Sequence, residues 1–307
     1  MGSYLSSPIT EKHLRTGENN LVTFASAEMQ GWRNTMEDAR LVNLSLSNES
    51  MCFGVFDGHG GKEVAIFVER HFCAELEKSS NFQSNRFDHA LRETFLLMDR
   101  LIQTKEGQRE LTRIQKDLPE SSNSTLTMDS FAGCTAVVAL IKGKNLWVAN
   151  AGDSRCVLAE GGKAIEMSHD HKPDLPGERS RIARAGGTVE DGRVMGNINL
   201  SRSMGDLEYK RNPALPPEEQ MITANPDILS RALSSKSEYL ILACDGIWDI
   251  LTCQECVDLV YSCAAQGQSL SQTVETVLER CLAKDVSSSG GLGCDNMTMI
   301  LVKLNIL

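Results

Sequence analysis

The chain has 307 residues, of which 41% are hydrophobic and 23% are charged, and its formal net charge is −10 at pH 7. This composition is typical of a soluble globular protein with one large or two smaller domains. The acidic charge argues against nucleic acid as a partner, since phosphate backbones are bound by clustered Lys and Arg. We find no apolar run of about 18 residues and no signal-peptide pattern, so we expect neither a membrane span nor secretion. The ten cysteines are therefore expected to be reduced, intracellular thiols.

Residues 1–20 are predicted to form an N-terminal tail that is irregular over residues 7–20. Gly2 and the hydroxyl of Ser6 fit the pattern for N-myristoylation. A disordered polar tail without lipid is the alternative. A single acyl chain would give at most weak, reversible membrane association.

Two strands are expected at residues 21–29 and 39–47, from their β-branched and alternating residues. The connection between them carries Arg33, followed by the adjacent carboxylates Glu37 and Asp38. One interpretation is a solvated loop with a surface ion pair, which contributes little to stability. The functional interpretation is a cationic fork for phosphate beside a metal-binding carboxylate.

An apolar strand through Phe56 ends at the turn Asp57-Gly58-His59-Gly60-Gly61, where a carboxylate and an imidazole lie among glycines. Such a turn is weak evidence alone, because turns are rich in Asp and Gly. Apolar spacing then predicts helices over residues 61–77 and 87–104. The polar residues 105–129 are expected to form a mobile loop.

The second half of the chain repeats the pattern of a strand that ends at an acidic turn. A meander of short strands (residues 131–141, 145–150, 155–159 and 164–167) has Asp153 in its second turn. A short helix near residues 178–185 precedes an irregular stretch at 188–225. A buried strand at 239–244 then ends at Asp245, with Asp249 close behind. Helices are expected at 253–265 and 269–284, and Asp295 and Asn296 introduce a last strand at 297–304.

Asp57, Asp153, Asp245 and Asp295 all border apolar strands. A single such carboxylate is usually a turn residue, but several brought together by strand pairing would repel one another unless cations lay between them. Ligand sets made only of oxygen favour Mg²⁺ or Mn²⁺ over zinc. A pair of these ions lowers the pKa of water and so provides a nucleophile for phosphate-ester hydrolysis. Arg33 could then bind the phosphoryl oxygens, and His59 could protonate the leaving group.

Together these motifs resemble the metal-dependent protein serine/threonine phosphatases of the type 2C family. The matching segments are Gln30–Arg33, Met36–Asp38, Phe56–Gly61, Ala151–Arg155, Asp170–Pro173, Arg181–Gly187, Ser201–Asp206, Ala243–Asp249 and Asp295–Asn296. They cover nearly the whole chain in the family's order. The resemblance implies an α+β fold in which a β-sandwich of two antiparallel sheets is flanked by helices and holds a metal cleft at one end. Residues 21–307 would form a single catalytic domain, with a flap at about 188–225.

The resemblance also implies roles for individual residues, including two tightly bound Mg²⁺ or Mn²⁺ ions and a weaker third. Asp57 would bridge the pair, the Gly58 carbonyl and Glu37 would serve one ion, and Asp245 and Asp295 the other. Asp153, Asp245 and Asp249 would hold the third ion. Asp38 would lie behind the ligands, and Asn296 would orient a metal-bound water. Arg33 would hold the substrate phosphate, with His59 as general acid.

Two functions from different classes remain open at this point. The first is an active phosphatase for phosphoserine and phosphothreonine in phosphoproteins. The second is a pseudophosphatase that serves as a binding module, although every expected metal carboxylate is present. A metal-dependent nuclease fits the bare chemistry, but the acidic charge disfavours it. We expect a cytoplasmic and also nuclear monomer, with a minor membrane-associated fraction if Gly2 is acylated.

Overall fold

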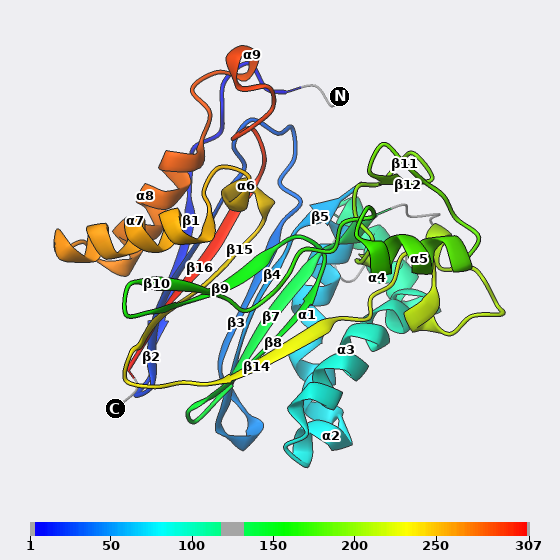
Figure 1. Cartoon of the computed structure of the whole chain (residues 1–307), viewed down its shortest axis with the longest axis horizontal. Coiled ribbons are helices and arrows are strands. Elements are labelled where there is room, and N and C mark those ends of the chain that lie inside the picture. The colour runs from blue at the N-terminus through cyan, green and yellow to red at the C-terminus, as the bar shows by residue number, and fades with distance from the viewer. Residues whose placement is uncertain (1–3, 118–131, 306–307) are drawn as a thin grey trace.

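The computed structural model describes residues 4–117 and 132–305 and contains two antiparallel sheets packed face to face (Figure 1). The first sheet has the order β1-β2-β16-β15-β9-β10. Its strands are β1 (His13–Glu18), β2 (Val22–Met29), β16 (Met297–Leu304), β15 (Ser237–Ala243), β9 (Arg155–Glu160) and β10 (Lys163–Glu166). The second has the order β14-β8-β7-β4-β3. Its strands are β14 (Asp227–Ala232), β8 (Asn145–Ala151), β7 (Ala136–Lys142), β4 (Ser50–Phe56) and β3 (Ala39–Leu46).

Strand β4 shows why the apolar runs of the sequence fold into this sandwich. All seven of its residues are buried. Met51, Phe53 and Val55 face the core between the two sheets, whereas Cys52 and Phe56 face the helices on the other side. Successive side chains of a strand point to opposite faces, so a strand covered on both faces must be apolar throughout.

Helices cover the outer face of each sheet (Figure 1). On the second sheet lie α1 (Glu63–Lys78), α2 (Ser80–Gln83), α3 (Phe87–Ile102) and α4 (Lys105–Gln115). On the first lie α6 (Asp245–Trp248), α7 (Cys253–Ala265) and α8 (Leu270–Cys281). The predicted fold, a sandwich of two antiparallel sheets flanked by helices, is confirmed. In the described residues no helix combines the length and apolar character needed to cross a bilayer.

Smaller elements gather at one end of the sandwich. A short sheet has β6 (Gly133–Cys134) between β5 (Gly58–His59) and β13 (Met204–Gly205). Near this end lie also α5 (Pro176–Arg184) and the hairpin of β11 (Val189–Glu190) and β12 (Arg193–Val194). The other small elements are α9 (Val286–Ser289) and the 3-10 turns η2 (Leu207–Tyr209) and η3 (Pro217–Glu219), while the 3-10 turn η1 (Ser47–Glu49) joins β3 to β4 at the opposite end (Figure 1). Most of residues 188–225 is therefore irregular, as predicted.

Two local predictions are wrong, and one strand was missed. Residues 7–20 are not irregular throughout, because β1 pairs with β2 along its whole length. Residues 105–129 are not a loop throughout, because α4 buries Leu111 and Ile114 against α1 and α3; residues 118–129 of that predicted loop lie outside the described residues. Strand β14 was not predicted at all. The division into an N-terminal tail and one catalytic domain stays a prediction, and Gly2 lies outside the described residues.

Buried charges attach the irregular 188–225 region to the sandwich. Arg181 of α5 donates to Glu178 Oε2 (2.7 Å) and to the Ser201 carbonyl (2.6 Å). Arg202 contacts Glu178 Oε1 (2.8 Å) and reaches Asp227 Oδ1 (2.8 Å) at the start of β14. Burial alone would raise the pKa of Glu178, but hydrogen bonds from Arg202 and the charges of both arginines lower it to about 2. The glutamate therefore stays ionised and paired at neutral pH.

Candidate active site

One cavity of about 780 Å³ brings together the predicted catalytic and metal-binding residues. Among its lining residues are Arg33, Glu37, Asp57, Gly58, His59, Asp153, Asp245, Asp249, Asp295 and Asn296. Asp38 is buried and does not line the cavity. The structure thus brings ten of these eleven residues to one cavity and buries the eleventh, Asp38. The role of each residue stays a prediction.

Antiparallel pairing explains why these distant residues meet. Strand β15 ends at Ala243, opposite Met299 near the start of β16, so Asp245 and Asp295 leave the same end of neighbouring strands. In the other sheet, the Asp57 carbonyl after β4 accepts a hydrogen bond from the Thr135 N–H (2.9 Å) just before β7. Asp153 follows β8, which pairs with β7. Both sheets therefore deliver carboxylates to one end of the sandwich.

Two glycines permit close backbone approach in the cleft. A Cβ at Gly58 would lie 2.2 Å from the Glu37 carbonyl oxygen, and one at Gly246 would lie 2.0 Å from the Asn296 carbonyl oxygen. Both distances are well inside van der Waals contact, and both neighbours are backbone atoms. Only glycine lets the turns after β4 and β15 pack against these segments.

The carboxylates perturb one another strongly. Removal from bulk solvent raises the pKa of Asp57, and the charges of Asp245, Asp38 and Asp153 raise it further. The pKa of Asp245 is raised by the same kind of desolvation and then by Asp153 and Asp295. Burial raises the pKa of Asp38 to about 7, even though Thr298 Oγ1 donates to its Oδ2 (2.7 Å). A cation among these groups would relieve this destabilisation.

The donor set fits Mg²⁺ or Mn²⁺. Asp38, Asp57 and Cys244 offer ligand atoms that all lie within 4.8 Å of one another. Burial raises the pKa of the Cys244 thiol well above its ordinary value, so Cys244 stays protonated and the available donors are carboxylate and carbonyl oxygens. Hard divalent ions prefer such donors.

Asn296 holds the segment between β2 and β3 in place. Its side-chain amide donates to the carbonyls of Gln30 and Thr35 (2.9 Å each), and its Oδ1 accepts from the Glu37 N–H (2.9 Å). Glu37 is fixed further at its Oε2, which accepts from the Gly61 N–H (3.1 Å). Because both amide N–H groups of Asn296 are used, a water could be bound only by the second lone pair of Oδ1. The predicted role of Asn296 in orienting a metal-bound water stays untested.

Arg33 contacts a predicted metal ligand, which the sequence did not indicate. Its Nη2 lies 2.5 Å from Asp295 Oδ2 at the partly exposed mouth of the cavity. Burial alone would lower the pKa of Arg33, but the charge and hydrogen bond of Asp295 raise it. The guanidinium is therefore a permanent positive charge beside the acidic cluster.

His59 has a buried partner that was not predicted. Its Nε2 lies 2.8 Å from Asp206 Oδ2, and Ser203 Oγ donates to the same carboxylate oxygen. Burial alone would lower the pKa of His59, but the charge and hydrogen bond of Asp206 raise it. The sequence contained the segment 201–206 but gave no indication that it lies beside His59. Strand β6, which pairs with both β5 and β13, brings the two together.

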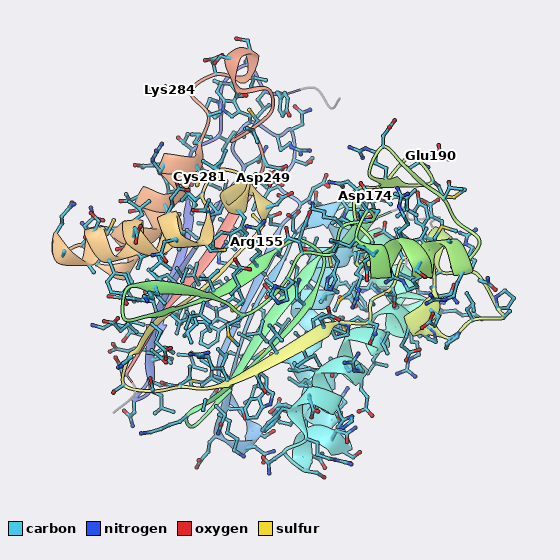
Figure 2. All side chains as sticks on the ribbon, viewed as in Figure 1. Arg155, Asp174, Glu190, Asp249, Cys281 and Lys284 are labelled. Carbon is cyan, nitrogen blue, oxygen red and sulfur yellow. The ribbon has the colours of Figure 1, made fainter. Side chains whose placement is uncertain are left out.

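Asp249 and Asp153 also line the cavity. Asp249 follows α6, and Arg155 lies on β9 at the same end of the sandwich (Figure 2). Asp153 is buried and forms an ion pair with Lys172, another contact that the sequence did not indicate. Together with Asp245, these are the residues predicted for a third ion, and that role stays a prediction.

Comparison with known proteins agrees with this geometry. The family model "Protein phosphatase 2C" matches residues 22–290. "Protein phosphatase 2C 1" from Paramecium tetraurelia is 50% identical over 308 residues, covering 99% of each chain. "Probable protein phosphatase 2C 11" from Oryza sativa subsp. japonica is 42% identical, over 99% of this chain and 91% of the relative. A crystal structure of a phosphatase from a pathogenic strain of Toxoplasma gondii superposes with a TM-score of 0.76 at 27% identity, covering 97% of this chain and 96% of that one.

A sandwich with a cleft of clustered carboxylates, together with these matches along the whole chain, defines the class. The chain belongs to the protein phosphatase 2C family and is a protein serine/threonine phosphatase.

Proposed function

We propose that the protein hydrolyses phosphoserine and phosphothreonine esters of phosphoproteins with Mg²⁺ or Mn²⁺, without a covalent phosphoenzyme. The observation that carries this proposal is the set of carboxylates in one cavity whose pKa values are raised by burial and mutual repulsion. Glu37, the Gly58 carbonyl and Asp57 would hold one ion, and Asp57, Asp245 and Asp295 the other. When bound, such ions lower the pKa of water and supply a nucleophile at neutral pH.

The remaining groups of the cleft would act on the substrate itself. Arg33 lines the cavity and can offer two parallel N–H donors to phosphoryl oxygens. His59 would donate a proton to the departing seryl or threonyl oxygen, with Asp206 holding its ring. Because several carboxylates line the same cavity, Arg33 would also offset the repulsion that an incoming phosphate dianion meets there.

A pseudophosphatase that only binds phosphoproteins is the alternative, and one experiment separates the two. Purified protein is incubated with a phosphothreonine peptide and Mn²⁺, and inorganic phosphate is measured. Phosphate release that is abolished by EDTA and by Asp57→Asn supports the active phosphatase. Peptide binding without phosphate release supports the pseudophosphatase.

We also propose that the protein is a monomer in the cytoplasm and nucleus, with a minor membrane fraction that depends on acylation of Gly2. The motif at Gly2 and Ser6 supports the acylation. One myristoyl chain gives only marginal binding, and Lys12 and Arg15 are too few to add much. Intact mass from a myristoylating host tests it, with Gly2→Ala as the control, and an unmodified N-terminus there would contradict it.

A further inference from the structure

Lys172 lies among the carboxylates predicted to hold the third ion. Its Nζ donates to Asp153 Oδ2. Burial alone would lower the pKa of Lys172, but the charge and hydrogen bond of Asp153, and then the charge of Asp245, raise it. Lys172 also offsets part of the rise in the pKa of Asp249. The ammonium group of Lys172 thus contacts Asp153, and its charge also acts on Asp245 and Asp249.

The backbone keeps Lys172 in this position. The His171 N–H donates to the Gly152 carbonyl (3.0 Å), and the Gly152 N–H donates back to His171 Nδ1 (3.2 Å). His171 is 3% exposed, so this reciprocal pair is shielded from water. Because Lys172 and Asp153 directly follow the two paired residues, they are neighbours whatever their side chains do.

A second cation whose charge acts on Asp249, Arg155, is already paired with another carboxylate. Arg155 donates two hydrogen bonds to Asp170, at 2.7 Å from Nε and 2.9 Å from Nη2. A bidentate pair of this kind satisfies both groups. Asp170 is therefore paired with Arg155, and Lys172 forms its ion pair with Asp153. The Lys172 side chain is 42% exposed, so it can move into solvent on its flexible stem when another cation takes its place.

We propose that Lys172 competes with the third metal ion for Asp153 and thereby keeps that site weak. With the ion absent, the ammonium neutralises the buried carboxylate of Asp153. When the ion binds, the ammonium must leave, and the ion loses the free energy of the broken pair. The inference rests on the proposed metal-dependent function, and it identifies a residue that sets how strongly the third ion binds.

Mn²⁺ binding to the whole protein tests the proposal. Sites are counted and their affinities measured by isothermal titration calorimetry, and free Mn²⁺ is followed by electron paramagnetic resonance. In Lys172→Met the Mn²⁺ affinity of the third site should rise about 5- to 50-fold, which is within the usual range of coupling between two sites. The Mn²⁺ affinities of the two tight sites should not change. Lys172→Arg keeps the charge and should keep the site weak. Lys78→Met is the matched control, because exposed Lys78 pairs with Glu75 on α1, away from the cleft, and should change nothing.

Three outcomes would overturn the proposal. The first is a third Mn²⁺ site in Lys172→Met that binds no more tightly than in the wild type, and the second is the lack of a third Mn²⁺ binding event in both proteins. The third is a gain in Mn²⁺ affinity that persists when Asp153→Asn is added to Lys172→Met. Lys172→Gln provides the same readout if the Met variant does not fold, as judged by thermal unfolding without metal. Absence of the tight pair from the wild type would instead contradict the proposed function, so the two failures are distinguishable.

Discussion

Asp206 Oδ2 lies 2.8 Å from His59 Nε2, although 147 residues separate the two in the chain. This is the arrangement of a general acid–base histidine whose imidazole ring is oriented by a buried carboxylate. Asp206 is 2% exposed, and the backbone N–H of Asp206 donates to the Ala132 carbonyl (3.1 Å). The carboxylate is therefore fixed by the fold and in turn fixes the imidazole.

Removing either partner is expected to impair protonation of the leaving group. His59→Ala should lose about 10²- to 10⁴-fold in kcat on alkyl phosphates, the usual contribution of a general acid. The loss should be much smaller on aryl phosphates, whose leaving groups need less protonation. Asp206→Asn should show the same preference with a smaller loss. Parallel kcat measurements on both substrate classes check this prediction. Equal losses on the two classes would show that His59 is a structural residue of its loop and not the general acid.

The pH profile provides a second check on this pair. Asp206 raises the pKa of His59, so the protonated, acid form should persist to higher pH in the wild type than in Asp206→Asn. The alkaline limb of the kcat profile on an alkyl phosphate should therefore move to lower pH in the variant. Ser203→Ala leaves the carboxylate in place and is expected to shift that limb less. An alkaline limb that does not move would contradict the pairing.

Arg33→Ala should weaken substrate binding without loss of metal. Hydrogen bonds to charged groups contribute roughly 1.5–3 kcal/mol, so kcat/KM should fall about 10- to 150-fold. Arg33→Lys should recover only part of this, because one ammonium cannot replace the two parallel donors. Because Arg33 occupies Asp295 in the metal-free protein, Mn²⁺ affinity should be equal or higher in Arg33→Ala. Calorimetry checks this, and lower metal affinity would show that Arg33 organises the metal site.

Metal binding should release protons and weaken on acidification. Asp57 and Asp245 have raised pKa values, and that of Asp38 is about 7. These carboxyls hold protons in the metal-free fold up to higher pH than ordinary carboxyls, and an ion must displace them. Mn²⁺ affinity should therefore rise between about pH 6 and about pH 8. Calorimetry in buffers with different ionisation enthalpies measures the protons released on Mn²⁺ binding. No proton release anywhere in this pH range would contradict the prediction.

The same shifts act on the stability of the metal-free protein. A carboxyl whose pKa is higher in the folded state favours folding at low pH, and this advantage is lost as pH rises above the ordinary carboxyl range. The metal-free form should therefore lose stability as pH approaches about 7, and Mn²⁺ should restore it.

Glu178 is expected to contribute to stability in the opposite direction. Its pKa falls from 4.5 to about 2 on folding, so its contribution is fully present above about pH 4.5 and is lost as pH falls through about 2. Glu178→Gln should cost on the order of 3 kcal/mol at neutral pH, at 1.36 kcal/mol per pKa unit. Urea unfolding near pH 7 measures the cost. Glu219→Gln, whose partner Arg184 is exposed, should cost less than about 1 kcal/mol, and equal costs would contradict a special role for Glu178.

Local sequence determines the buried elements well and the exposed strands poorly. The strand through Phe56 and the last strand, β16, were predicted because burial on both faces requires continuous apolar runs. Strand β1 has almost only exposed side chains and is held by backbone pairing to β2. Strand β14 has no fully buried residue either. Such edge strands leave little hydrophobic pattern to detect.

The site shows the same division. The acidic residues were predictable because each follows its own strand and because their motifs resemble those of a family. The ion pairs of His59 with Asp206 and of Lys172 with Asp153 were not, because they depend on which turns the sheets bring together. No pattern local to either partner encodes such a contact.

Strand β16, the last of the chain, lies between β2 and β15 in the first sheet. Until it emerges from the ribosome, β2 and β15 lack their shared neighbour, and Asp295 has no fixed position. A nascent chain that ends before residue 295 should therefore be catalytically silent, however well its first sheet-forming segments have folded. Because pairing of the first strands with the last also carries a high loop-closure cost, assembly of the cleft should be a late event in synthesis. Phosphatase activity would thus appear only once residues 295–304 have been synthesised and β16 has paired with both neighbours.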